Sequence, residues 1–307
     1  MNHSMVGIVI GGIIPAFVFG GYGVMQKQCM RAGLGVAGFF LVLGGTVTVC
    51  ALAVCAWAPG GVPPLGAALS AIGYALFWSL GIGLILLAVD RFSASISQLA
   101  PLYNSATLIT VLLGLWLFAE WKEVGALPLL LGAVAIVTGA VIVTRASKES
   151  PPDSNSAGPS SRTRHRQALL IGGLLPAVVL GVTGPLMKNA MRGGMGTGEF
   201  LVVFGVTLVG VGLACRPWRN GRTIPRAAVV TGVVTGVMWT LGTALTLVAL
   251  GRLGANISQL TPLFNMNTLV VVLLGLWLFK EHRHMRSAPL VIGAALVFLG
   301  AVLVARA

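Results

Sequence analysis

The amino-acid sequence contains two copies of one unit, separated by 161 positions and aligned without a gap. Segments 95–120 and 256–281 are identical at 18 of 26 positions. Both segments carry the motif Ser-Gln-Leu-x-Pro-Leu-aromatic-Asn. Two halves this similar must share one fold, and a duplicated unit in an apolar chain is typical of a transporter.

The composition indicates that lipid is the main solvent of this fold. Only 9% of the residues are charged, 56% are hydrophobic, and the mean hydropathy is +0.94. A soluble domain usually has about 25% charged residues. Each half has five apolar stretches of the length that spans a bilayer, namely 5–26, 36–58, 66–89, 93–118 and 125–144, then 167–187, 197–215, 227–249, 254–279 and 287–305. Because lipid offers the backbone no hydrogen bonds, we predict an all-α membrane protein with ten transmembrane helices.

The halves are joined by a linker at 145–166 that is rich in Ser, Pro and Gly and has basic ends. We therefore divide the chain into a first five-helix repeat (1–144), this flexible linker and a second five-helix repeat (167–307). Five is an odd number of crossings, so the second repeat must enter the membrane from the opposite side. The sequence predicts two inverted repeats.

The positive charges indicate an orientation. If the spans are as predicted, 15 of the 20 lysines and arginines lie on the face opposite both termini. The positive-inside rule then puts the linker in the cytoplasm and both termini outside, in a bacterial inner membrane. No basic residue precedes the first stretch, so we expect it to be retained as a helix and not cleaved as a secretory signal.

Several classes of function are disfavoured. The net charge of +13 lies in loops without interleaved aromatic residues, so we expect no nucleic-acid partner. The four cysteines form no CxxC pair and the histidines are peripheral, so we expect no metal and no cofactor. None of the seven acidic residues lies mid-span. The sequence shows no buried nucleophile and no acid–base pair of the kind that would indicate an enzyme.

The fourth span of each half contains the strongest candidate site. Pro101 and Pro262 interrupt these spans, and a helix broken in lipid survives only where protein or a water-filled cavity receives the freed backbone groups. Four amides lie beside the breaks: Gln98, Asn104, Gln259 and Asn265. They suit a neutral polyhydroxylated ligand, although they could instead bond only to neighbouring helices.

Other repeated residues are candidates for the same site. Pro15 and Pro176 interrupt the first spans and could act as hinges or cavity walls, or accompany tight helix packing. Trp78 and Trp239 fall mid-span, where they could stack on a sugar ring or fill the core. A single substrate is not symmetric, so we expect specificity where the repeats differ. Such positions are Tyr22 against Thr183, Tyr103 against Phe264, Ser105-Ala106 against Met266-Asn267, and Ser95 against Asn256.

Lys27 and Lys188 end the first span of each half. Lysines at such positions usually extend to the lipid headgroups. The functional alternative is contact with an anionic group of the substrate.

Ten helices in two five-helix repeats resemble the drug/metabolite transporter superfamily. So do the ends of the fourth spans, where Gly114 to Glu120 and Gly275 to Glu281 form an aromatic-rich run that closes on glutamate. Gln98 followed by the run 118–122 is similar to the glucose/ribose uptake branch, and EamA-type exporters are the competing branch. The resemblance implies termini in the cytoplasm, opposite to the charge count, so the orientation stays open.

We therefore predict a secondary transporter that moves a small polar metabolite, a sugar or polyol, by alternating access through a cavity between the repeats. Its expected partners are this small molecule and the lipid bilayer. Export of amino acids or amphipathic metabolites is the alternative within the same class. A membrane scaffold or lipid-binding protein without transport is the alternative from another class.

Overall fold

The computed structural model describes residues 3–57, 60–92, 99, 102–146, 166–215, 224–270, 273–274 and 287–307. Every regular element within these ranges is a helix. The first repeat contains α1 (His3–Ile8), η1 (Val9–Ile13), α2 (Ile14–Arg31), α3 (Gly35–Trp57), α4 (Leu65–Phe92), α6 (Ala106–Leu117), η2 (Glu120–Lys122) and α7 (Ala126–Ala146). The second contains η4 (Leu170–Leu174), α9 (Leu175–Gly181), α10 (Thr183–Arg192), α11 (Thr197–Ala214), α12 (Arg226–Arg252), α13 (Ile257–Phe264) and α15 (Ser287–Arg306).

Eight helical runs among the described residues are long and apolar enough to cross a membrane. They correspond to the predicted spans other than 93–118 and 254–279, which are described in part as α6 and α13. The all-α membrane fold with ten helices is thus confirmed. Most of the predicted linker, at 147–165, lies outside the described residues.

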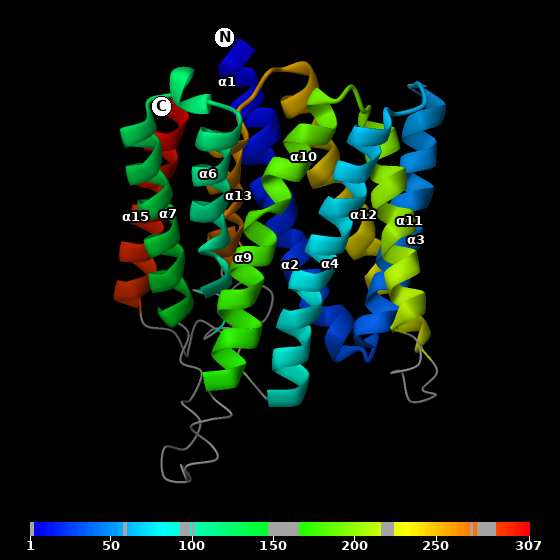
Figure 1. Ribbon diagram of the computed structural model, residues 1–307. Coiled ribbons are helices and arrows are strands. Elements are labelled where there is room, and N and C mark those ends of the chain that lie inside the picture. Colours follow the sequence, from blue (N-terminus) through cyan, green and yellow to red (C-terminus); the bar gives the residue numbers. More distant parts are fainter. Residues whose placement is uncertain are drawn as a thin grey trace, which may run out of the picture.

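The repeats run in opposite directions, as the odd number of spans requires. Both termini lie at the same end of the molecule, and α9 leads into α10 towards that end while α1 and α2 lead away from it (Figure 1). The end of the chain is held there, because the Gly125 N–H donates to the Ala307 carbonyl at 2.7 Å. We call this end the termini face.

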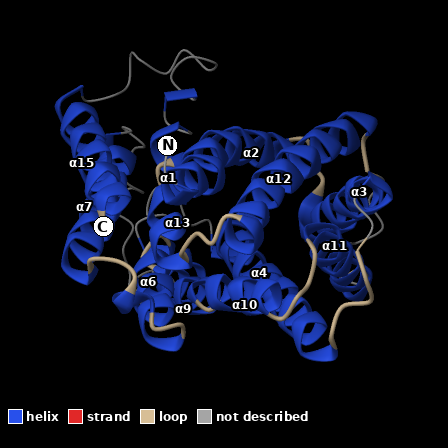
Figure 2. Ribbon diagram, turned by 90° about the horizontal axis from the view of Figure 1, so that it is seen from above, coloured by secondary structure: helices blue, strands red, loops and turns tan. Residues whose placement is uncertain are grey.

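The repeats interlock through equivalent helices. Figure 2 shows α3 beside α11 at one side of the molecule and α7 beside α15 at the other. Glycine permits the close approach of α3 and α11: a Cβ on Gly44 would lie 2.7 Å from the Gly205 carbonyl oxygen, and these glycines are 161 positions apart. Without a hydrophobic force between helices in lipid, such backbone contact supplies the packing.

The prolines of the first spans produce a wider helical turn instead of a break. Pro15 follows the π-turn η1, and Pro176 follows the equivalent π-turn η4. Pro15 is buried and the helix continues through it. Neighbouring glycines pack tightly, since a Cβ on Gly11 would lie 2.2 Å from that of Ala249 and one on Gly172 would lie 2.3 Å from that of Ala88. These segments therefore pack tightly against the other repeat, and the hinge role of Pro15 and Pro176 stays a prediction.

Candidate substrate cavity

A cavity of about 260 Å³ lies between the two repeats. Its wall includes Phe19, Tyr22, Tyr74, Trp78, Ile82, Tyr103, Asn104, Ala106, Thr107, Thr110, Leu180, Thr183, Gly184, Met187, Trp239, Thr243, Thr246, Ile257, Thr261, Phe264, Asn265 and Asn267. These residues come from the first, third and fourth spans of each half. No charged side chain occurs among the described residues of the wall.

Helical periodicity determines which side chains reach the cavity. On α12 they are Trp239, Thr243 and Thr246, and on α13 they are Ile257, Thr261 and Phe264. Both sets have the spacing i, i+4, i+7, which places three side chains on one face of a helix. Each helix therefore presents a single stripe to the cavity.

The wall is built largely from equivalent positions of the two repeats. Seven pairs of lining residues are separated by the repeat offset: Phe19 and Leu180, Tyr22 and Thr183, Trp78 and Trp239, Ile82 and Thr243, Tyr103 and Phe264, Asn104 and Asn265, and Ala106 and Asn267. The cavity thus lies across the axis that relates the repeats. Only the tryptophan and asparagine pairs keep the same residue type, so the chemistry of the wall is asymmetric.

Hydroxyl groups line the cavity from both repeats: Tyr22, Tyr74, Tyr103, Thr107 and Thr110 on the first, and Thr183, Thr243, Thr246 and Thr261 on the second. Thr243 occupies the position equivalent to Ile82, and Thr246 and Thr261 line the cavity at positions equivalent to Ile85 and Ala100. On the first repeat, the hydroxyl oxygen of Tyr22 is buried and has no hydrogen-bond partner among the described residues. A buried phenol without a partner costs free energy, and Tyr22 lines the cavity, so a ligand there could satisfy it.

The two asparagines bridge the repeats while lining the cavity. Asn104 donates from Nδ2 to Thr268 Oγ1 at 3.4 Å, and Asn265 donates from Nδ2 to Thr107 Oγ1 and, at 3.4 Å, to the Asn104 carbonyl. Each asparagine also begins a turn that separates the two parts of its span. The side-chain amide nitrogens of both asparagines therefore bond to the other repeat, and both residues also line the cavity.

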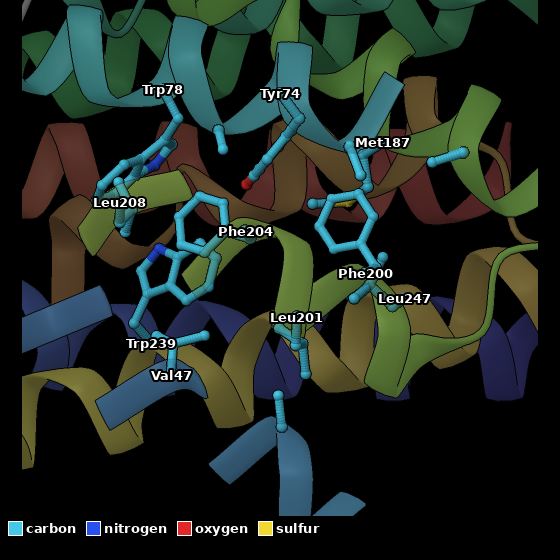
Figure 3. Close-up of a cluster of buried hydrophobic side chains, with 14 of the residues drawn as sticks. Val47, Tyr74, Trp78, Met187, Phe200, Leu201, Phe204, Leu208, Trp239 and Leu247 are labelled. Atoms are coloured by element: carbon cyan, nitrogen blue, oxygen red, sulfur yellow. The ribbon is translucent and has the colours of Figure 1, made fainter. Parts of the chain in front are cut away.

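Trp78 and Trp239 belong to an aromatic cluster that borders the cavity. The Phe204 ring stacks on Trp239 with a centroid distance of 4.0 Å and an interplanar angle of 9°, and Trp78 meets both rings edge-on. Figure 3 shows the indoles of Trp78 and Trp239 on either side of Phe204, with Tyr74 close by. Phe204 therefore covers one face of Trp239, and the tryptophans combine core packing with a place in the cavity wall.

Two lining threonines satisfy carbonyls that prolines leave without a helical partner. Pro15 removes the N–H that would bond to the Gly11 carbonyl. The Thr246 hydroxyl lies 3.3 Å from that oxygen and shares its proton between it and the Gly242 carbonyl of its own helix, at 3.0 Å. Pro185 likewise frees the Gly181 carbonyl, and Thr110 Oγ1 donates to it at 2.7 Å. Both bonds connect one repeat with the other, so they hold the wall together.

Other predicted residues lie elsewhere. Gln259 is buried on α13 at 6% exposure but does not line the cavity, and Gln98 and Pro101 lie outside the described residues. Pro262 is inside α13, which ends two residues later. Lys27 is exposed near the end of α2.

The expected headgroup contact is wrong for Lys188, which is buried at 6% exposure. Its Nζ forms an ion pair with Glu120 and donates to Asn256 Oδ1 at 3.0 Å. Since Glu120 neutralises this cation inside the protein, the structure gives Lys188 a protein carboxylate in place of the anionic substrate group. Glu120 is only 1% exposed, although it follows an apolar span and has the sequence position of a loop residue.

Sequence reasoning also missed the lining threonines. A signal was present, because Thr240, Thr243 and Thr246 recur at helical spacing in the second repeat, where the first repeat has Ser79, Ile82 and Ile85. Pro185 was missed too, and its equivalent in the first repeat is Val24.

Comparison with known proteins connects this cavity to a class of function. Residues 5–307 match the family model described as "Sugar transport protein". A solved structure entitled "Crystal structure of protein" matches with a TM-score of 0.69 and 15% sequence identity, and the match covers 95% of each chain. That likeness shows a shared fold. No curated protein matches.

Proposed function

Because the chain belongs to the sugar transport protein family and is thus a membrane sugar transporter, not an enzyme, we propose that its central cavity binds one small neutral sugar. The cavity would expose this sugar to the two sides of the membrane in turn. One observation carries the proposal: the described wall is uncharged and combines hydroxyls, amides and aromatic rings on matched faces of two inverted repeats.

The chemistry of the wall suits a sugar. Threonine and tyrosine hydroxyls both donate and accept hydrogen bonds, as sugar hydroxyls do, while aromatic rings cover the apolar faces of a sugar ring. The volume of about 260 Å³ is just below the usual range for ligand pockets, roughly 300–1,000 Å³. We therefore propose a monosaccharide or a polyol of similar size as the substrate.

The inverted repeats support alternating access. In transporters of this type the site lies at the repeat interface, and the two sides open when one repeat moves against the other. Two repeats with equivalent wall positions can exchange conformations, which opens the cavity first to one side and then to the other.

The same wall disfavours amino acids. A zwitterion would bury an ammonium and a carboxylate, which need partners of opposite charge, and the described wall offers none. A scaffold without transport would have a packed interface between the halves, whereas this interface contains the cavity.

We also propose the orientation that the positive charges favour, with the linker in the cytoplasm of a bacterial cell and both termini outside. A tag on Ala307 that is accessible to protease in intact spheroplasts would support it. A tag accessible only in inverted vesicles would reverse it.

Purified protein in liposomes tests the proposed substrate class. We expect saturable uptake of at least one monosaccharide from a panel of hexoses, pentoses and polyols, and no competition by neutral amino acids. Saturable flux of an amino acid without flux of any sugar or polyol would refute the proposal.

A further inference from the structure

A buried group of charged and polar residues lies beside the cavity wall, next to the lining residues Met187 and Ile257. Glu120 in η2 and Lys188 in α10 form an ion pair, with side chains 1% and 7% exposed. Asn256, directly before α13, accepts a second bond from Lys188 Nζ at 3.0 Å. The pair therefore joins the first repeat to two separate helices of the second.

Glu120 also holds the beginning of α13. Its Oε1 accepts the Ile257 N–H at 3.2 Å, and its Oε2 accepts the Ser258 N–H at 3.0 Å. These N–H groups have no partner within the helix, and a carboxylate at a helix N-terminus is favourable. Three side chains of the same helix, those of Ile257, Thr261 and Phe264, line the cavity. Glu120 thus anchors a helix that forms part of the wall.

The cavity wall is tightly packed beside this ion pair. A Cβ on Gly184 would lie 2.4 Å from Thr110 Cγ2 and 3.2 Å from Ile257 Cγ1. Glycine is therefore required for α6, α10 and α13 to meet at this level. Lys188 lies one turn further along α10 than Gly184, on the same face of the helix. Beyond the tightly packed Gly184, the next residue on this face of α10 is thus the buried Lys188.

A second cation close to the pair is Arg192, whose guanidinium carbon lies 5.0 Å from the centre of the Phe118 ring. Lys188 Nζ lies 5.3 Å from the same ring. The aromatic face attracts both cations and packs them against the end of α6. Removing the carboxylate would leave this arrangement with excess buried positive charge.

We propose that Glu120 and Lys188, together with Asn256, form the gate that closes the cavity on the termini face, and that they position α13 for substrate binding. Opening this side requires the carboxylate to release both Lys188 and the N-terminus of α13. The inference rests on the proposed alternating-access function. In this proposal the three residues stabilise the conformation that is closed on the termini face, and they do not contact the sugar.

Thiol accessibility tests the gate without reference to any substrate. The cavity residue Met187 is replaced by Cys in a background where the four native cysteines are alanine. Sealed vesicles of both orientations, identified with a C-terminal tag, are then treated with a membrane-impermeant maleimide. Glu120→Gln and Lys188→Met should each raise the reaction rate from the termini face by about tenfold or more, because each strands a buried charge in the closed state only.

Matched controls are available on the same surface. Glu123 and Lys122 are exposed neighbours of Glu120, so Glu123→Gln and Lys122→Met remove the same charges without touching the gate. Their rates should equal that of the parent. Unchanged rates in folded Glu120→Gln and Lys188→Met would overturn the proposal.

A reversible cross-link tests the gate even if the charge variants fold poorly. The Cβ of a side chain at Gly114 would lie 3.4 Å from that of Ser258, near the separation in disulfides, about 3.5–4.5 Å. Oxidation of Gly114→Cys/Ser258→Cys should stop transport, reduction should restore it, and neither single variant should respond. Full transport with the cross-link complete would overturn the gate. Gated thiol reactivity without sugar transport would instead refute the proposed substrate.

Discussion

The bond between Thr110 and the Gly181 carbonyl offers a quantitative test of how the two repeats are held together. Thr110 is 2% exposed and donates to this oxygen at 2.7 Å. Pro185 has no N–H to offer it. Thr110→Val keeps the shape of the side chain and leaves the carbonyl without its donor. An unsatisfied buried group costs about 1–3 kcal/mol in soluble proteins, and hydrogen bonds between membrane helices average about 0.6 and reach about 1.7 kcal/mol. We expect a loss of about 1–2 kcal/mol in the free energy of unfolding.

Two further variants separate this mechanism from a general effect of losing a hydroxyl. Thr240 is 5% exposed and donates to the Gly236 carbonyl at 2.7 Å, but that carbonyl also receives the N–H of residue 240 in the helix. Thr240→Val should therefore cost under about 0.5 kcal/mol. Pro185→Ala restores an N–H for the Gly181 carbonyl. In this background, the cost of Thr110→Val should fall by about half or more.

Reversible unfolding in mixed detergent micelles, followed by circular dichroism, gives the free energies of unfolding of the parent, the three single variants and the double variant. The reasoning would be refuted if Thr110→Val and Thr240→Val cost the same, or if Pro185→Ala left the cost of Thr110→Val unchanged. Either result would mean that the carbonyl freed by the proline does not depend on the threonine.

Three other predictions concern the cavity and its neighbours. Tyr22→Phe should raise the Kd for the sugar by about tenfold, because it removes a hydroxyl that a ligand would satisfy, and it should not lower the unfolding free energy; unchanged affinity in equilibrium binding would refute this. Exchanging Tyr103 and Phe264 (Tyr103→Phe with Phe264→Tyr) should change the ranking of sugars in competition uptake, since it moves a hydroxyl across the repeat axis, and an unchanged ranking would remove these positions from the specificity determinants. Gln259→Leu should change expression or unfolding free energy while the KM for uptake stays within about twofold, because Gln259 is buried away from the wall; a KM raised tenfold in folded protein would place its amide in the site.

The architecture could be predicted because it depends on local properties of the chain. Apolar stretches of bilayer length give the helices, and a gapless repeat with an odd number of spans gives the inversion. Equivalent positions of the repeats then meet at one axis. For this reason, Trp78, Trp239, Asn104 and Asn265 could be assigned to the cavity region from the sequence.

The differences between the predicted and the observed cavity wall depend on rotation about a helix axis. Gln259 lies two positions after Ile257, so it points to roughly the opposite side of α13 from the cavity stripe. The short distance in sequence between Gln259 and Pro262 does not determine which way the Gln259 amide points. The helical spacing i, i+4, i+7 predicts the lining threonines when it is applied to each helix and not only to the repeated motif.

The burial of Lys188 and Glu120 could not be predicted from local sequence. Each follows an apolar run, where charged side chains usually reach the headgroups or water. They are 68 positions apart, and only the folding of η2 against α10 and α13 removes both from solvent. Such a pair is formed by tertiary packing, which the composition of either segment does not encode.

Equilibrium binding of a transported sugar to purified protein tests the central claim, that the cavity between the repeats is the substrate site. Thr243→Phe fills the cavity from α12, and Thr231→Phe adds the same ring to a half-buried position of the same helix that does not line the cavity, where the Thr231 hydroxyl bonds only to its own helix. We predict that Thr243→Phe raises the Kd by about 100-fold or more, because it occupies the space of the ligand, and that Thr231→Phe leaves it unchanged. Sugar binding of normal affinity to folded Thr243→Phe would contradict the account.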